Sequence, residues 1–171
     1  VARMRLFREG WLAALDAIDF DHLSSPAKID WLLLRNRIRR AERQAELDGI
    51  AYAAIESLLP EPAGMIELIE ARERTPPIAA HEVAERLQRV TASARAAEER
   101  LRKSLGDATA RPTPSRCRKA LLHLQSLRRE LASAYRFRDG YDPDFTWWAQ
   151  APWTEASAAL DSFERVLREE R

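Results

Sequence analysis

Hydrophobic residues recur along most of this chain at steps of three and four positions, the period of an amphipathic α-helix. The longest such stretch covers residues 26–59, where Ser24 and Ser25 supply a serine cap and Pro26 lies in the first turn. A helix of roughly 50 Å with one continuous apolar stripe needs several partners to cover it. We therefore predict that this helix organises the fold. Its stripe, interrupted only at Asp48, consists of Leu34, Ile38, Ala41, Ala45, Tyr52, Ile55 and Leu59.

The same period predicts further helices over residues 2–18, 63–74, 79–105 and 114–137. A short aromatic turn and then a last helix, opening at Pro152, should follow. The helix over 79–105 has the most regular heptad and should pack lengthwise against a neighbour. Its heptad positions are Val83, Leu87, Val90, Ala94, Ala97, Leu101 and Ser104.

Three of the other predicted helices each present one apolar face. In the first helix this face consists of Met4, Phe7, Trp11, Leu15 and Ile18. In the helix over 114–137 it consists of Cys117, Leu121, Leu124, Leu127, Leu131 and Ala134. In the last helix the inward residues should be Ala156, Ala159, Leu160, Phe163 and Leu167.

Proline, glycine and capping residues mark the connections between these helices. The clearest break is Thr75-Pro76-Pro77, because each proline biases the preceding residue away from helix. Gly106 should end one helix, while Thr113 and Asp142 should cap the next two. No β-type alternation is longer than chance. We predict a single all-α domain over residues 1–171, a bundle of six to seven mostly antiparallel helices with two or three long ones.

Composition narrows the class of protein but not its function. The 28 basic and 27 acidic residues among 171 nearly cancel, so no bulk field favours nucleic acid or an anionic membrane. No apolar run approaches the length of a membrane span, and the first residues do not read as a signal peptide. Cys117, the one cysteine, cannot form an internal disulfide and falls on an apolar stripe, which predicts a packed thiol. The cellular compartment stays open.

The segment His81-Glu82-Val83-Ala84-Glu85 begins like the HExxH zinc helix, in which two histidines share one face. Its fifth residue is glutamate, however, and no third ligand is suggested by the sequence. An acidic first helical turn, stabilised by the helix dipole, explains the segment better.

Two other clusters resemble metal ligands at first sight: Asp19 and Asp21 with His22, and Asp139 and Asp142 with Asp144. The first is ordinary for a polar turn between helices. The second fails the EF-hand spacing, because its third and fifth positions hold no carboxylate and its sixth holds no glycine. We therefore assign no metal ligand, cofactor-binding residue or catalytic residue within the sequence.

The basic residues gather in one place only, where Arg35, Arg39 and Arg43 share a helix face. Such a row suits phosphate contacts. Glu42 and Glu46 can pair with it at helical spacing, and no aromatic residue is interleaved. We favour a solvated or interface-facing surface over nucleic-acid binding.

Large aromatic residues are concentrated near the C-terminal end. Such a cluster can line a ligand groove or a partner site, or it can wedge the end of a helical layer. We favour a core or inter-domain wedge. The candidate interface or cleft-wall residues are Tyr141, Phe145, Trp147, Trp148 and Trp153.

Four phrases carry a family resemblance. They are LDAIDFDHLSSPAKIDWLLLRNRI at 15–38, LLP at 58–60, IELIEAR at 66–72 and YRFRDGYDPDFTWWAQAPW at 135–153. As an ordered set, which spans nearly the whole chain, they resemble the N-terminal helical part of the DUF885 family of bacterial proteins.

That family resembles gluzincin-type zinc metallopeptidases, with a largely helical fold and a much longer chain. Its zinc-binding His-Glu helix lies far downstream of the matched region, so no residue of this sequence inherits a catalytic or metal-binding role. The resemblance implies an N-terminal fragment that forms one wall or lid of a substrate cleft, with zinc held by the remainder of the parent chain. The alternative is a stand-alone helical module without catalytic activity that holds a partner protein.

Overall fold

The computed structural model describes residues 2–72 and 78–170, and over these residues it contains helices but no strands. The predicted all-α class is therefore confirmed. Four helices are long, with 25 to 29 residues each, where the sequence predicts two or three. The elements are α1 (Ala2–Asp16), α2 (Ser25–Ala53), the 3-10 helix η1 (Glu56–Leu58), α3 (Ala63–Ala71), α4 (Ala80–Leu105), α5 (Pro114–Arg138) and α6 (Pro143–Glu169).

The chain, expected from its sequence to be one domain, divides by its contacts into two compact units. Unit 1 is Val1–Ala53 and holds α1 and α2, and unit 2 is Ala54–Arg171 and holds the remaining elements.

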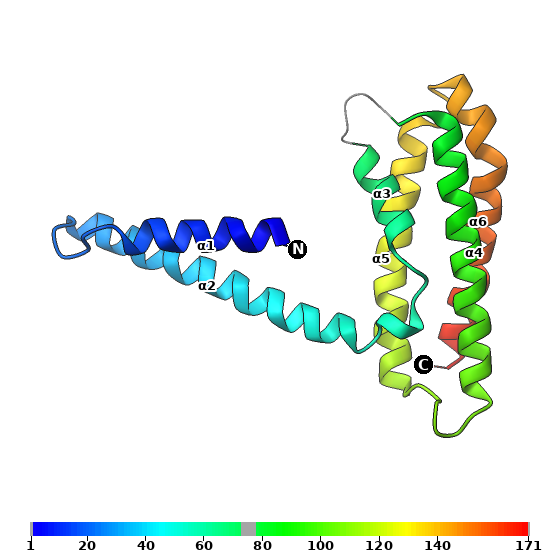
Figure 1. Ribbon diagram of the computed structural model, residues 1–171, viewed down its shortest axis with the longest axis horizontal. Coiled ribbons are helices and arrows are strands. Elements are labelled where there is room, and N and C mark those ends of the chain that lie inside the picture. Colours follow the sequence, from blue (N-terminus) through cyan, green and yellow to red (C-terminus); the bar gives the residue numbers. More distant parts are fainter. Residues whose placement is uncertain (1, 73–77, 171) are drawn as a thin grey trace. The chain divides into compact units, whose positions relative to one another are not determined.

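Unit 1 is a helical hairpin in which α1 runs alongside α2 (Figure 1). The indole N–H of Trp31 donates a hydrogen bond of 2.9 Å to the carbonyl oxygen of Leu15. Beside it, the guanidinium of Arg35 lies 3.1 Å from the carboxylate of Asp16. The predicted serine cap is present, since the hydroxyl of Ser24 accepts from the backbone N–H of Ala27 at 3.4 Å.

The apolar stripe of α2 is not buried as the sequence analysis predicts. No residue of this helix is buried, and Leu34 is exposed. The predicted face of α1 is likewise uncovered, because Leu15 is its one buried member and Met4, Phe7, Trp11 and Ile18 are exposed. The physical reason is length: α1 has 15 residues against the 29 of α2, and two helices alone cannot enclose a core.

Helix α2 also ends earlier than predicted, at Ala53 rather than at residue 59. The two last members of its predicted stripe, Ile55 and Leu59, are instead buried in unit 2. Arginines of unit 2 satisfy the backbone carbonyls at this break: Arg116 donates to Ala54 at 2.8 Å and Arg100 donates to Leu59 at 3.2 Å. These tertiary hydrogen bonds replace the intrahelical bonds that a longer helix would have made.

Unit 2 is a bundle built on the long contact between α4 and α6 (Figure 1). Helix α5 packs on α6, and the short α3 packs against both α4 and α5. The predicted lengthwise packing of the helix over 79–105 is therefore confirmed, and six of its seven heptad residues are buried. Small side chains allow α4 and α6 to approach closely, and the buried alanines of the two helices are Ala84, Ala94, Ala97, Ala149, Ala156 and Ala159.

The predicted break at Pro152 is wrong, because α6 continues through this residue from Pro143 to Glu169. An internal proline removes one helical hydrogen bond and costs about 3 kcal/mol or more. The buried stripe of α6 runs on both sides of the proline, so packing against α4 and α5 holds the helix together. This stripe includes Phe145, Ala149, Ala156, Leu160, Phe163 and Leu167.

The predicted caps are confirmed. The hydroxyl of Thr113 accepts from the N–H of Arg116 at 3.3 Å, and the carboxylate of Asp142 accepts from the N–H of Phe145 at 3.1 Å. Gly106 is the C-cap of α4. The predicted break at 75–77 lies outside the described residues. Of the helices described, none combines the length and apolar character that a membrane span requires.

Candidate functional site

The aromatic segment begins at the tight connection between α5 and α6. Gly140 has a φ of +78°, a conformation that favours glycine, and its N–H donates to the hydroxyl of Thr146 at 3.0 Å. Asp142 then caps α6, with Pro143 in the first turn, where its missing N–H costs nothing. This local chemistry decides where the aromatic residues of α6 point.

The structure divides the five candidate residues into two groups. Phe145 is buried, with its ring centroid 5.5 Å from that of Tyr135. Trp153 is half-buried, and its ring stacks on the ring of Tyr135, with the two centroids 4.4 Å apart and an interplanar angle of 7°. These two residues pack within unit 2, as a wedge would.

The other three candidates are exposed to solvent: Tyr141 by 89%, Trp147 by 83% and Trp148 by 52%. Phe137, near the end of α5, is exposed as well. We call Phe137, Tyr141, Trp147 and Trp148 the aromatic surface. They lie around the connection from α5 to α6. Large exposed apolar groups among polar neighbours are typical of interaction sites.

Two members of the aromatic surface touch basic or polar side chains. The guanidinium of Arg72 lies 4.8 Å from the ring centroid of Phe137, and the imidazole of His81 meets Trp148 edge-on at 6.3 Å. An open hollow of about 570 Å³ lies beside Arg72 and Phe137, and its lining also includes Tyr141, Arg138 and Asp142. The hollow combines aromatic walls with a cation, which suits a carboxylate-bearing or aromatic group of a partner.

Sequence reasoning missed Phe137 and Arg72 as parts of this surface. Phe137 does not fall on the apolar stripe of α5, and that departure was the available signal. Arg72 could not have been placed from sequence, because it comes from α3, whose contact with α5 is tertiary.

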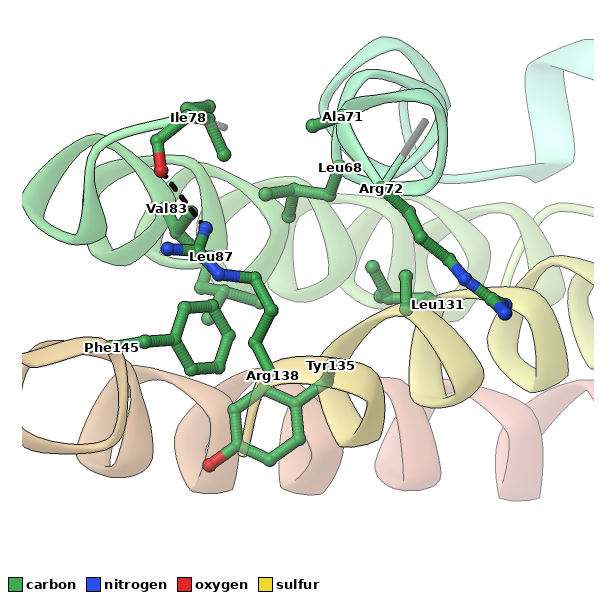
Figure 2. A pocket seen from close by; sticks show the side chains of 11 residues that line it. Leu68, Ala71, Arg72, Ile78, Val83, Leu87, Leu131, Tyr135, Arg138 and Phe145 are labelled. Atoms are coloured by element: carbon green, nitrogen blue, oxygen red, sulfur yellow. Dashed lines mark hydrogen bonds between the residues drawn. The ribbon is translucent and has the colours of Figure 1, made fainter. Parts of the chain in front are cut away.

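A small, partly open cavity lies next to this surface, between α3, α4, α5 and the start of α6 (Figure 2). Its volume is about 30 Å³, which is room for about one water molecule. Figure 2 shows leucine, valine and phenylalanine side chains around it, and the guanidinium of Arg138 reaching across to the carbonyl of Ile78 at 2.9 Å. The cavity is therefore a packing defect rather than a substrate pocket.

Arg138 joins the ends of three elements. Besides Ile78, it contacts the carboxylate of Asp142 at 2.8 Å and lies 4.5 Å from the ring centroid of Phe145. The hydrogen bond from Arg138, with that from the N–H of Phe145, lowers the pKa of Asp142. These contacts of Arg138 hold the start of α6 against the end of α5 and the segment before α4.

A groove of about 650 Å³ runs between α5 and α6 and contains the main charge network of unit 2. The carboxylate of Glu164 accepts from Gln125 at 2.8 Å and from Arg168 at 2.6 Å, and it also pairs with Arg128. Burial raises the pKa of Glu164, but these hydrogen bonds and the charge of Arg128 outweigh burial and lower it. The network joins the two helices.

The residues that resemble metal ligands make hydrogen bonds within their own turn or lie exposed on the surface. His22 bonds to Asp19 at 2.6 Å, and Asp19 accepts from the N–H of Asp21 at 3.2 Å. In the HExxH-like segment His81 and Glu85 are exposed. Within residues 2–72 and 78–170, no three His, Cys, Asp or Glu side chains are grouped so as to hold a metal ion.

Two residues of the arginine row, Arg35 and Arg43, have structural partners, and Cys117 is packed in the core. Arg35 pairs with Asp16 and lies 4.9 Å from the ring centroid of Trp31, and Arg43 contacts Glu46 at 3.0 Å. Cys117 is buried, as predicted. Burial, followed by the charge of Glu170, raises the pKa of its thiol, which disfavours the reactive thiolate.

Comparison with models of protein families, with curated proteins and with solved structures gave no match for this chain.

Proposed function

We propose that this chain is the N-terminal helical part of a DUF885-like zinc metallopeptidase and forms a wall or lid of its substrate cleft. The observation that carries the proposal is the aromatic surface, in which Trp147 and Tyr141 are almost fully exposed on an otherwise well-packed unit. Such side chains are expected to meet another surface. The four ordered sequence phrases resemble the DUF885 family, and on this proposal the remainder of such a parent chain supplies that other surface.

On this proposal the zinc ion is held by residues beyond 1–171. The described residues offer no fitting ligand group, so the chain itself would contribute binding surface and not chemistry. A zinc hydrolase needs its ligands, its general base and an open coordination position together. We therefore expect residues 1–171 alone to be inactive as a peptidase.

The first test is to sequence the encoding gene past Arg171. The proposal expects an open reading frame that continues for several hundred residues and reaches a His-Glu zinc helix. A stop codon directly after Arg171 would overturn it. In that case the aromatic surface belongs to a stand-alone helical interaction module, the second candidate function, and its partner protein becomes the question.

A second test uses the longer chain with Trp147→Ala. If Trp147 lines the cleft, this variant should raise KM for peptide substrates with a smaller change in kcat, because uniform substrate binding is lost. Leu122→Ala is the matched control, since Leu122 is also an exposed apolar residue of unit 2 but lies outside the aromatic surface. Equal kcat and KM values for the two variants would show that Trp147 does not line the cleft.

A further inference from the structure

Helix α1 carries an apolar stripe that unit 1 leaves largely exposed, with Leu15 as its one buried member. Met4, Phe7 and Trp11 recur at steps of three and four, so they lie on one side of the helix, and all three are exposed. The rings of Phe7 and Trp11 already pack edge-on, with centroids 6.2 Å apart. Contiguous exposed apolar side chains of this kind mark an interaction surface.

The charges of α1 are separated along its length. Its first half holds Arg3, Arg5 and Arg8 against Glu9, a net charge of +2, and residues 10–15 are uncharged. At its end and in the following turn come Asp16, Asp19 and Asp21, a net charge of −3 with His22 neutral. Even with Asp16 paired to Arg35, this end keeps a charge of −2.

Helix α2 reinforces this separation. Beyond Arg35, residues 36–53 of α2 carry four arginines against Glu42, Glu46 and Asp48, a net charge of +1. Near the turn, Lys28 and Asp30 cancel. The hairpin is therefore positive at its open end and negative at its turn.

We propose that a second copy of this chain covers the stripe, with the two α1 helices antiparallel about a two-fold axis. In this arrangement the negative turn of each copy lies beside the positive open end of the other, and Phe7 of one copy lies opposite Trp11 of the other. A parallel pairing would place like charges together, which is unfavourable. A two-fold axis requires a self-complementary surface, and a helix with opposite charges at its ends and an apolar middle is one.

This interface is separate from the proposed function. It is formed by unit 1, whereas the proposed cleft wall is the aromatic surface of unit 2. The dimer can therefore be tested on the 171-residue chain, and its failure would leave the metallopeptidase proposal standing.

The first experiment is sedimentation equilibrium on the wild-type chain and two variants. The wild type should have twice the 19.6 kDa mass of the monomer. Trp11→Glu places a charge at the centre of the interface and should weaken dimerisation by about 30-fold or more. Leu6→Glu is the matched control: Leu6 is more exposed than Trp11, 63% against 46%, but lies on the opposite side of α1, so this variant should stay dimeric.

Circular dichroism should show unchanged helix content in both variants. A monomeric wild type would overturn the proposal, since the stripe would then be covered by something other than a second copy. Equal weakening by Leu6→Glu and Trp11→Glu would also overturn it, because non-specific association does not distinguish the two sides of a helix.

The second experiment tests orientation by disulfide cross-linking, with Cys117 retained because it is buried. If Phe7 lies opposite Trp11, then residue 4 lies opposite residue 14 of the other copy. Met4→Cys mixed with Ala14→Cys should therefore cross-link readily, and Met4→Cys alone should not. Efficient cross-linking of Met4→Cys to itself would indicate parallel helices and overturn the antiparallel arrangement.

Discussion

At the scale of single residues, unit 2 depends on a few charged side chains that are almost enclosed. Glu164 is the clearest example, with Gln125, Arg128 and Arg168 all bonded to one carboxylate. Its side chain is only 12% exposed, so solvent screens these contacts less than it would at an open surface. Because the partners come from α5 as well as from α6, the carboxylate links two helices.

The variant Glu164→Gln should lower the free energy of unfolding at pH 7 by about 1–3 kcal/mol, because charged hydrogen bonds become neutral ones. The folded pKa of Glu164 is lowered from its ordinary value of 4.5. Its contribution is therefore complete well above pH 4.5 and is lost as pH falls through the lower folded value. Urea unfolding at pH 7 and near pH 3 measures this difference.

Glu169→Gln, an exposed glutamate of the same helix, is the control and should change stability little at either pH. A deficit in Glu164→Gln that persists undiminished near pH 3 would show that the carboxylate charge is not its cause.

At the scale of elements, α6 shows packing overriding a local signal. Pro152 predicts a helix boundary by every local rule, yet it lies inside a continuous helix. The burial of Phe145 before the proline and of Phe163 after it fixes both halves of α6 in the same bundle. The helix therefore tolerates an internal proline that an isolated peptide would not.

Replacing Pro152 by Ala should stabilise the protein by about 1–3 kcal/mol, since a backbone N–H becomes available to the carbonyl of Trp148 and helix propensity improves. Thermal unfolding measures the gain. Pro143→Ala is the control, because a proline in the first turn breaks no helical hydrogen bond and its removal should bring no such gain. If Pro152→Ala is no more stable than the wild type, the proline ring itself contributes to packing.

At the scale of the whole molecule, the two units differ in how far their hydrophobic residues are buried. Unit 2 encloses a core in which Leu87, Leu124 and Phe163 are almost inaccessible to solvent, whereas α2 in unit 1 has no buried residue. The apolar content of unit 1 is nonetheless high. Its exposed side chains are the surface on which the proposed self-association through α1 rests.

The core of unit 2 should account for most of its resistance to unfolding. Leu124→Ala should reduce the free energy of unfolding by about 2–5 kcal/mol, through lost burial and a cavity. Leu122→Ala, an exposed leucine on the same helix, should change it by less than about 0.5 kcal/mol. Amide hydrogen exchange of α4, α5 and α6 provides the readout, and similar protection in the two variants would mean that Leu124 is not part of the cooperative core.

The helical class, the caps and the buried faces of unit 2 could all be predicted from the sequence. Thr113 and Asp142 cap helices where predicted, and the heptad from Val83 to Leu101 is buried, because these features depend on spacing and on hydrogen bonds between near neighbours. The aromatic segment was recognisable for the same reason: its residues are close in sequence.

Tertiary structure alone decided which apolar stripes are covered. Periodicity states that a face is apolar but not that a partner exists, so the stripes of α1 and α2 look as core-like in sequence as that of α4. Just after the end of α2, the carbonyl of Ala54 accepts a hydrogen bond from the distant Arg116, and the continuity of α6 depends on packing across Pro152. The division of the aromatic residues follows likewise from long-range contacts: Trp153 stacks on Tyr135, whereas Trp147 stays exposed.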